Sequence, residues 1–369
     1  MKRNITGLLI ALLCPLLCPA QNSDTLRSQE LADVEVIARR VTSKLKRDSL
    51  GSLSLDLSFL DNMPKILGNA DPIHYTQLLP SVQTNTEMDA GLHVQGCDNS
   101  HNDISIDGVP LYNVQHILGL FSVFNASHFS TLRFSSSAFS ASASNRLGGY
   151  LDMQHADSVP GKAGGDFSLG LISSQGTLRL PMGQRSALFL SGRAAYMNLL
   201  YGQWLKVDGT VLKYSFYDAN LTWLYHPDNR NTLWLNYYSG NDVVSYDEGG
   251  YQYDARLKWG NYMTSLNWER KQNGLTLMQT AYLTTYRNRF RLEESDFSVY
   301  LPSSILDYGY KASIRGNHFS IGTDWAVHHI HPQAPSVRGD VQTHTLSDIR
   351  QHAWRVRCGA IINFPWFPV

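Results

Sequence analysis

Residues 102–113, Asn-Asp-Ile-Ser-Ile-Asp-Gly-Val-Pro-Leu-Tyr-Asn, decide the fold of one part of this chain. Ile104 and Ile106 alternate with polar residues and run into Asp107-Gly108, a dipeptide that favours a two-residue hairpin turn. The chain resumes as Val109-Pro-Leu-Tyr112. Because proline has no amide hydrogen, it lies on an edge strand or at a bulge. We therefore predict a compact hairpin whose second strand is at the edge of a sheet.

The hairpin belongs to a predicted domain of mixed strands and short helices, residues 56–155. Asp71 before Pro72 is a helix start signal, and Pro80 ends the predicted helix 73–79. Short strands are expected within 91–96, 119–125 and 131–134, where apolar residues are bounded by turn-forming residues.

The first twenty residues have the features of a signal peptide that is cleaved on export. Lys2 and Arg3 form a basic start, residues 8–17 are apolar, and Ala20 precedes the expected cleavage point. A lipid-anchored form is disfavoured, because the cysteines of this segment lack the preceding small residues of a lipid-attachment site. We expect an exported protein.

Composition excludes several classes of partner and site. The chain has 31 basic and 31 acidic residues without a basic block, so nucleic acid is not an expected partner. After the leader only Cys97 and Cys358 remain, without neighbours at metal-ligand spacing, so we expect no disulfide framework, metal or cofactor. No later segment has the roughly 20 apolar residues of a transmembrane helix, so this chain can enter a membrane only as strands.

From residue 165 onward the sequence alternates with a period of two. In residues 217–226 one face carries Tyr217, Ala219, Leu221, Trp223 and Tyr225, and the other carries Asp218, Asn220, Thr222, Leu224 and His226. Residues 186–198, 232–238, 257–267, 275–292 and 318–329 alternate likewise. Strands of about ten residues with an apolar outer face and aromatic ends are typical of outer-membrane barrels. A soluble sandwich also alternates, but short turns such as 228–231 favour the membrane.

Six segments resemble, in the same order, the plug domain of TonB-dependent outer-membrane receptors of the Bacteroidetes type. They are Met63-Pro-Lys-Ile-Leu-Gly-Asn-Ala-Asp71, Gln77-Leu-Leu-Pro-Ser-Val-Gln83, Gly91-Leu-His-Val-Gln-Gly96, Ile106-Asp-Gly-Val-Pro-Leu-Tyr-Asn113, Gly119-Leu-Phe-Ser-Val-Phe-Asn125 and Arg146-Leu-Gly-Gly-Tyr150. Each motif alone is weak, whereas six in one order are a strong signal. The resemblance covers about residues 57–155, and the later strands resemble the start of the family's barrel.

The resemblance implies a plug that fills a large barrel and opens when an inner-membrane TonB-type energy-coupling protein pulls on an N-terminal segment. The plug residues that carry the match are Leu79, Pro80, Val94, Gln95, Gly96, Asp107, Gly108, Val109, Pro110, Tyr112, Asn113, Phe121, Asn125, Arg146, Gly148 and Gly149. A coupling-box-like segment, 31–38, is carried by Leu31, Asp33, Val34, Glu35, Val36 and Ile37. Such a segment donates backbone hydrogen bonds to a partner's sheet edge. The alternative, that it is the first plug strand, stays open.

Two positions depart from the family pattern. Gln95 stands where members usually carry an arginine that can pair with carboxylates of the barrel wall. Residues 135–137 are serines where lysine and glycines are common. The first change removes an ion pair between plug and wall, if one exists, and the second removes backbone freedom.

Length predicts an incomplete barrel. A barrel that houses a plug has about 22 strands, whereas residues 165–369 supply about 8 to 10. The predicted fold class is therefore an α+β plug followed by antiparallel transmembrane strands of an incomplete β-barrel. We expect a signal peptide at 1–20, a mobile arm at 21–55, the plug at 56–155 and the partial barrel at 165–369, and we interpret the chain as a truncated receptor, for which an inactive form is one alternative.

The resemblance implies energy-coupled uptake of a solute across the outer membrane. Its expected partners are the bilayer, the energy-coupling protein, the solute and a surface lipoprotein. The alternative is a small self-closed barrel with a periplasmic mixed domain that acts as an adhesin or scaffold. The solute cannot be identified from the sequence; residues 84–90 and 112–118 are the candidate contacts, because loops at hairpin ends carry function.

An enzyme is disfavoured, because the sequence has no Gly-x-Ser-x-Gly elbow, phosphate loop or His-Glu-x-x-His motif. On a strand, His329 and His331 share one face and His328 the other, so a strand end is favoured over a metal site. Tyr237 and Tyr238 are expected in an interface belt, while residues 239–253 are expected to form a long loop with further tyrosines.

Overall fold

The structure is a computed structural model. It describes residues 45–47, 52–63, 65, 67–84, 91–116, 119–137, 146–202, 204, 206–207, 210–248, 253–294, 297–333, 335–338 and 347–360. All of them belong to one compact unit, Thr42–Val369. The expected signal peptide and the coupling-box-like segment lie outside the described residues.

The first part of the described chain, here called the plug, is a small mixed domain. Its elements are β1 (Leu45–Arg47), β2 (Leu53–Asp56), η3 (Leu57–Asn62), α2 (Pro72–Thr76), β3 (Val82–Gln83), β4 (His93–Val94), η4 (Asn99–His101), β5 (Asp103–Ile106), β6 (Val109–Pro110), β7 (Gln115–His116), β8 (Phe121–Ser122), η6 (Ala126–His128), β9 (Thr131–Ser135) and β10 (Tyr150–Gln154). The plug sheet has the strand order β1-β2-β9-β10-β5-β6.

The predicted hairpin is confirmed. β5 and β6 pair antiparallel around Asp107 and Gly108, whose φ angles of 47° and 75° are those of a tight hairpin turn. Pro110 lies in β6, the edge strand of the plug sheet, where its missing amide hydrogen leaves no ladder bond unmade. Ile104 and Val109 point into a core that also contains Leu151 of the parallel neighbour β10.

Two details of the plug differ from the sequence-based expectation. Helix α2 begins at Pro72 as predicted, with Asp71 accepting hydrogen bonds from two amides of its first turn, but it ends at Thr76 instead of residue 79. Strands β1 and β2 belong to the plug sheet, although β1 and the first three residues of β2 fall in the expected arm 21–55. The plug sheet thus begins before Asp56, because Leu53 and Leu55 pack against its core.

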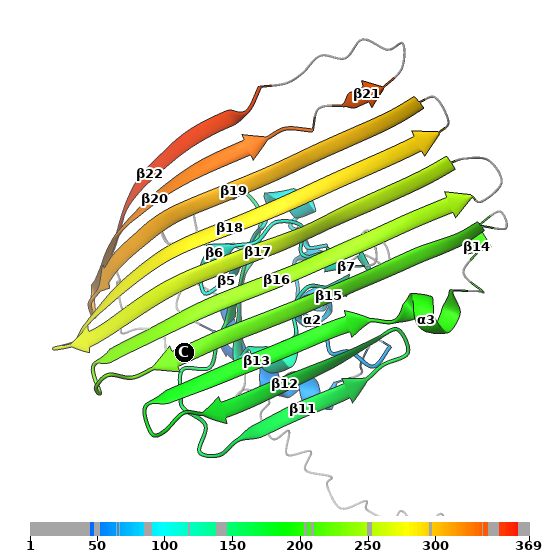
Figure 1. Cartoon of the computed structure of the whole chain (residues 1–369). Coiled ribbons are helices and arrows are strands. Elements are labelled where there is room, and N and C mark those ends of the chain that lie inside the picture. The colour runs from blue at the N-terminus through cyan, green and yellow to red at the C-terminus, as the bar shows by residue number, and fades with distance from the viewer. Residues whose placement is uncertain are drawn as a thin grey trace, which may run out of the picture. The chain divides into compact units, whose positions relative to one another are not determined.

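The second part, here called the wall, is one antiparallel sheet (Figure 1). Its elements are β11 (Gly164–Leu169), β12 (Ser173–Pro181), β13 (Ser186–Ala195), α3 (Met197–Tyr201), β14 (Lys206–Val207), β15 (Thr210–Tyr225), β16 (Asn231–Glu248), β17 (Tyr253–Gln272), β18 (Leu275–Glu294), β19 (Phe297–Arg315), β20 (Phe319–His331), β21 (Ser336–Arg338) and β22 (Ile349–Ala360). The main path runs β11-β12-β13-β15-β16-β17-β18-β19-β20-β22, and β14 and β21 pair to its side. β11 and β22 do not pair among the described strands, so the sheet is open, as predicted.

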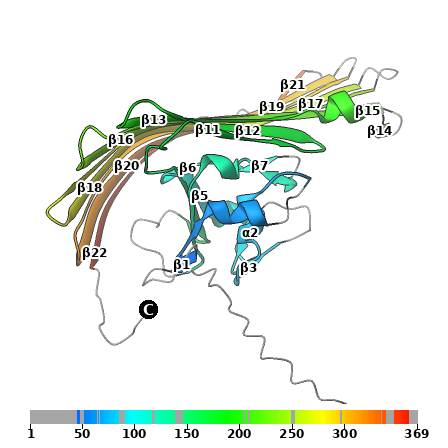
Figure 2. The same cartoon turned by 90° about the horizontal axis from the view of Figure 1, so that it is seen from below.

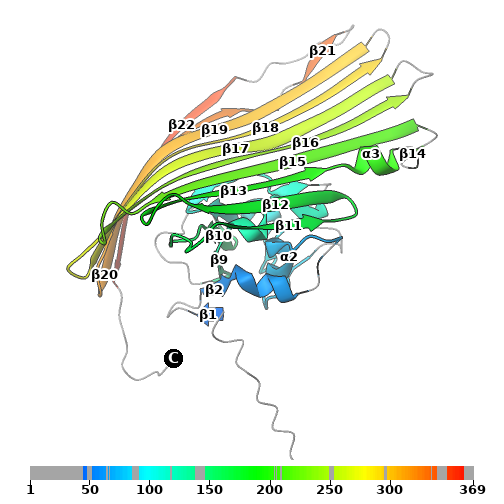
Figure 3. The ribbon, with the colours of Figure 1, turned by 60° about the horizontal axis from the view of Figure 1, so that its bottom comes forward.

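The wall curves over the plug, which lies against its concave face (Figures 2 and 3). Alternation places Asp218, Asn220 and Thr222 of β15 on this inner face, where all three are buried, while Tyr217 on the outer face is 44% exposed. The face assignment for residues 217–226 is therefore confirmed. The adhesin alternative required the mixed domain to lie outside the barrel, whereas the structure packs it against the inner face.

β15, β16 and β17 have 16, 18 and 20 residues and are longer than the predicted stretches 217–226, 232–238 and 257–267, whereas β18, with 20 residues, nearly matches the predicted 275–292. The long loop expected at 239–253 is wrong, because β16 continues to Glu248 and carries Tyr246. The belt position predicted for Tyr238 is also wrong, since its side chain points inward and is 1% exposed. Its neighbour Tyr237 points outward, 42% exposed. No helix in the described part of the chain has the length and hydropathy to cross a membrane.

Candidate functional site at the plug–wall interface

The hairpin turn contacts two wall strands. The Asp107 carboxylate accepts a hydrogen bond from Asn236 Nδ2 of β16 at 2.6 Å, and the Gly108 carbonyl accepts one from Lys311 Nζ of β19 at 2.6 Å. Within the plug, Asp107 also pairs with His155 Nδ1 at 2.9 Å. Burial alone raises the pKa of Asp107, but the charge and hydrogen bonds of His155, with the bond from Asn236, outweigh it and lower the pKa. The turn is thus a charged contact with the wall.

The segment after the hairpin continues along the wall. Tyr112 donates its amide hydrogen to Asn261 Oδ1 at 3.2 Å and its hydroxyl hydrogen to the buried carboxylate of Asp307. Asn113 Nδ2 donates to the Tyr286 hydroxyl at 3.2 Å. Burial, followed by the charge of Asp307, raises the pKa of Tyr112. Tyr112 therefore stays protonated and remains a donor to the wall.

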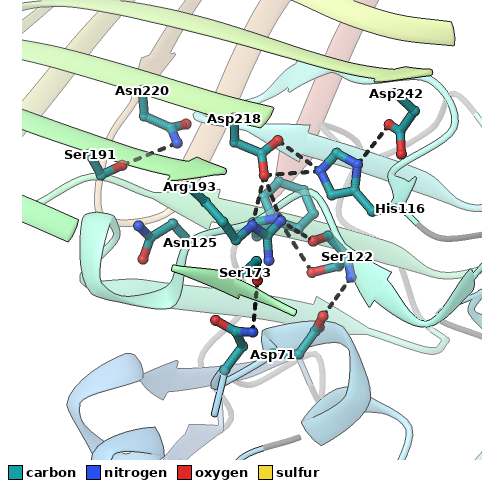
Figure 4. Close-up of polar contacts among 12 residues, drawn as sticks. Asp71, His116, Ser122, Asn125, Ser173, Ser191, Arg193, Asp218, Asn220 and Asp242 are labelled. Atoms are coloured by element: carbon teal, nitrogen blue, oxygen red, sulfur yellow. Dashed lines mark hydrogen bonds and ion pairs between the residues drawn. The ribbon is translucent and has the colours of Figure 1, made fainter. Parts of the chain in front are cut away.

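His116, in β7, lies between two carboxylates of the wall (Figure 4). Its Nδ1 is 2.7 Å from Asp242 Oδ2, and its Nε2 is 2.8 Å from Asp218 Oδ1. The ring stacks on Phe216 with 4.3 Å between centroids. Burial lowers the pKa of His116, but the two carboxylates outweigh burial and raise it. The imidazole is therefore held as a cation that donates from both nitrogens.

A second cation balances the second carboxylate. Arg193 of β13 donates from Nε to Asp218 Oδ2 at 2.8 Å and from an Nη to the Ser122 carbonyl at 2.5 Å. The Ser122 amide in turn donates to the carboxylate of Asp71 at 2.5 Å. Because Asp71 also caps α2, the contacts run from that helix through β8 to the wall (Figure 4).

Each buried charge in this group has an opposite charge beside it. His116, Arg193 and Asp218 are at most 3% exposed, and Asp242 is 1% exposed. Removing one partner of a buried pair leaves an uncompensated charge and costs about 3–5 kcal/mol. The plug is therefore docked by a cluster of four residues, here called the ionic latch: His116, Arg193, Asp218 and Asp242. The buried charges of this latch are stable only together.

Neutral contacts extend the interface on the β12–β15 side. Asn69 Nδ2 donates to Ser173 Oγ at 3.1 Å, and His128 Nε2 is 3.1 Å from Thr222 Oγ1. Burial lowers the pKa of His128 to about 3, so this imidazole is neutral. His116 and His128 are thus two buried histidines of the same interface, one of them a cation and the other neutral.

A cavity of about 1150 Å³ lies between the plug and the short-turn ends of the wall. The plug lines it with Asp107, Arg133 and His155, and the wall lines it with residues that include Trp234 and Lys271. His155 stacks on Trp234 with 4.7 Å between ring centroids. The cavity is polar and charged, which suits a hydrated solute better than an apolar one.

The other predicted plug residues are mainly structural. Gly148 and Gly149 lie where a Cβ atom would come within 2.5 Å of Asn102 Oδ1 and 2.6 Å of Val94 Cγ2, so only glycine fits. Val94, Val109 and Phe121 are core residues, and Leu79 packs at the core's edge. Gln95 and Gly96 form an exposed turn, Asn125 caps η6, and Arg146 donates to the Ser100 carbonyl at 3.4 Å.

The candidate solute contacts at 112–118 are in part occupied by the wall, because Tyr112 and His116 bind it directly. Of 84–90, only Thr84 is described. The histidines at 328–331 follow the predicted faces: His328 contacts the inner Asp307 at 2.8 Å, while His331 contacts Asp348 at 2.6 Å. The described residues contain no group of three or more ligands that could hold a metal ion.

Sequence reasoning missed the ionic latch. Asp218 was assigned to the polar face, and His116 lay in a named segment, but their separation of 102 residues gives no local signal. The available clue was a charged residue on the inner face of a barrel strand, which needs a buried partner of opposite charge.

No protein-family model matches this chain, and no curated protein does. Solved structures match it at low identity. The outer-membrane transporter YddB from Escherichia coli has a TM-score of 0.50 at 12% identity, with 84% of this chain and 58% of that chain covered. The copper transporter OprC has a TM-score of 0.54 at 12% identity, with coverage of 85% and 52%. The ferric yersiniabactin uptake receptor FyuA from Yersinia pestis has a TM-score of 0.50 at 11% identity, with coverage of 83% and 60%.

The fold is that of a plugged outer-membrane transporter. It confirms the fold expected from the resemblance to TonB-dependent receptors, an α+β plug with the strands of an incomplete barrel. The chain spans between 52% and 60% of the length of these three proteins. Their names describe all three as transporters or as an uptake receptor.

Proposed function

We propose that this protein takes up a solute across the outer membrane as an energy-coupled, plugged receptor. The ionic latch carries the proposal, because it docks the plug through buried charges that neither part can leave unpaired. A plug held in this way closes its side of the lumen at rest. It moves only when work is done on it.

The work is supplied, in this proposal, by an inner-membrane energy-coupling protein that pairs with residues 31–38. These residues precede the plug sheet, whose first strand is β1. A pull transmitted through β1 and β2 reaches the plug core first and the latch last. The cavity beside Asp107 and His155 then offers the polar space through which a solute passes.

A metal chelate is the solute class that the comparisons favour. The similar structures are named as a copper transporter and a ferric yersiniabactin uptake receptor. A surface lipoprotein that delivers the solute is a further proposed partner. It rests on the resemblance of the plug motifs alone.

The test is accumulation of radioactive iron and copper in cells that produce the protein from its own gene. The probes are a ferric hydroxamate, a ferric catecholate, ferric yersiniabactin and ionic copper. At least one should accumulate above the level of a gene deletion, and an uncoupler of the proton gradient should abolish the difference. The matched control deletes residues 31–38 and should bind the probe without accumulating it. Equal accumulation with and without the uncoupler would overturn energy coupling.

A further inference from the structure

The outer face of the wall carries a cluster of cations near the ends of three strands, at the end of the wall that also carries α3 and is here called the loop side (Figure 1). Its members, here called the basic patch, are Lys213 of β15, Arg256 and Lys258 of β17, and Arg287, Arg289 and Arg291 of β18, all exposed. Their chain neighbours Leu257 and Tyr286 point the other way, into the core with Trp259. Alternation therefore fixes all six cations on the face that points away from the plug.

Cross-strand register brings like charges together in the basic patch. Lys258 is directly opposite Arg289, and Arg256 is directly opposite Arg291. Side chains in such positions have Cβ atoms about 5 Å apart, and like charges there are destabilising. Two consecutive like-charge pairs on one face would be stabilised by an anion bound beside them.

Few acidic side chains of the described residues pair with the basic patch. Within the described residues, Arg291 has an acidic partner, Glu293 at 2.5 Å, while no ion pair involves Lys258, Arg287 or Arg289. Glu293 itself is opposite Asp254, one step farther toward the loops. The acids therefore lie at the rim of the patch, and its centre keeps an excess of positive charge.

On the same outer face, the rows of side chains next to the patch toward the short turns are apolar and aromatic. Leu235 is opposite Leu266, and the outward Leu283 is 41% exposed. Between these rows and the patch, Asn241 Nδ2 donates to the hydroxyls of Tyr217 and Tyr262 at 3.0 and 2.7 Å. Tyrosines with a polar end are typical of the headgroup level of a membrane. The basic patch lies directly on the loop side of that level.

We propose that the basic patch binds the phosphate groups of an outer-leaflet lipid whose chains lie on the apolar rows. Guanidinium groups recognise phosphate through two parallel hydrogen bonds, and three of the six cations are arginines on one strand. The longer connections of an outer-membrane barrel face the cell exterior, which places the patch in the outer leaflet. This inference rests on the proposed membrane placement but not on transport.

The experiment uses the full chain in phosphatidylcholine vesicles with trace spin-labelled phosphatidic acid or spin-labelled phosphatidylcholine. The fraction of each label immobilised at the protein surface gives the preference for the phosphate lipid. We expect several-fold preference for phosphatidic acid, and a fall of at least about fivefold in the variant Lys258→Gln/Arg289→Gln. The charge-preserving variant Lys258→Arg/Arg289→Lys should keep the preference.

The matched control, Arg185→Gln/Arg230→Gln, removes two cations from exposed turns at the opposite end of the wall and should leave the preference unchanged. A wild-type chain without preference, or an equal loss in this control, overturns the lipid site. Full competition by inorganic phosphate at constant ionic strength would instead identify a site for free anions and contradict lipid binding. A chain that does not float with the vesicles contradicts the membrane placement as well, whereas failure of solute uptake alone leaves the lipid site standing.

Discussion

His116 links the charge state of one side chain to the docking of the whole plug. The pKa of His116 is raised in the folded protein, because Asp218 and Asp242 outweigh burial. A raised pKa stabilises the fold fully below the unfolded value, about 6.5, and that stabilisation is lost as pH rises through the folded value. The docked plug should therefore loosen in alkali.

Replacement of His116 by glutamine should remove this pH dependence. The amide can bond one carboxylate but carries no charge, so we expect a loss of about 2–3 kcal/mol at pH 6. The measurement is denaturant unfolding of the chain in neutral detergent from pH 6 to pH 9. The pKa of His155 is raised too, so His155 adds its own pH dependence to both proteins. The informative quantity is therefore the difference between wild type and variant in the slope of the unfolding free energy against pH. Parallel slopes would refute the charge assignment.

The charge of Asp152, unlike that of His116, is unfavourable in the folded protein. Its carboxylate accepts hydrogen bonds from Ser105 Oγ and the Gly108 amide, both at 2.7 Å, but burial and the nearby Asp107 raise its pKa to about 6. A carboxyl group with a raised pKa stabilises the fold below its unfolded value, near 4, and loses that contribution as pH rises through 6. At neutral pH its charge is therefore a cost.

Asp152→Asn should stabilise the plug at pH 7.5, by up to about 2 kcal/mol. The new amide keeps an oxygen for Ser105 and Gly108, and Gln154 can turn its own oxygen toward the new NH2 group. Thermal unfolding at pH 7.5 and pH 4.5 measures the effect, which should vanish at the lower pH. Destabilisation at pH 7.5 would show that the ionised carboxylate is required.

At the scale of elements, the hairpin was predictable and the wall strands were predictable only in part. A turn such as Asp107-Gly108 is dictated by neighbouring residues, so its sequence suffices. β16 continues through Gly240, Asn241 and Asp242, which resemble a loop because both faces are polar there. The inner face meets the charged plug there, and on the outer face Asn241 bonds the hydroxyls of Tyr217 and Tyr262, so apolar alternation ends while the backbone ladder continues.

The element after the hairpin should dock largely through Tyr112. Asp307 is 0% exposed and is shared by Tyr112 and His328. Tyr112→Phe leaves the carboxylate with one partner fewer, and a hydrogen bond to a charged group contributes about 1.5–3 kcal/mol. We expect a loss of that size in the free energy of unfolding. The control Tyr300→Phe removes an outward hydroxyl of β19 and should be neutral within about 0.5 kcal/mol.

The same pair offers a sharper test of docking than stability alone. In a double-mutant cycle, Asp307→Asn should cost less when residue 112 is phenylalanine than when it is tyrosine. A coupling energy near zero would mean that the hydroxyl bonds water and that the contact is incidental.

At the scale of the molecule, the proposed uptake requires the plug and the wall to separate. Asn69 and Ser173 face each other across that interface at 3.1 Å between Nδ2 and Oγ. Cysteines at both positions, in a chain whose Cys97 and Cys358 are replaced by serine, can be joined by a short dithiol reagent. If uptake requires the plug to leave the wall, this tether should abolish energy-dependent accumulation of the metal chelate, and a cleavable reagent should allow recovery after reduction.

A second tether separates plug movement from damage to the wall. Ser191 and Asn220 are opposite each other on β13 and β15, with 3.2 Å between Oγ and Nδ2, and both point inward. Cysteines joined there cross-link the wall to itself, so they alter the lumen without holding the plug. Accumulation should survive this tether and fail with the first one. Survival in both would mean that solute passes a plug that stays docked to β12, and the pulling mechanism would have to be abandoned in favour of rearrangement within the plug.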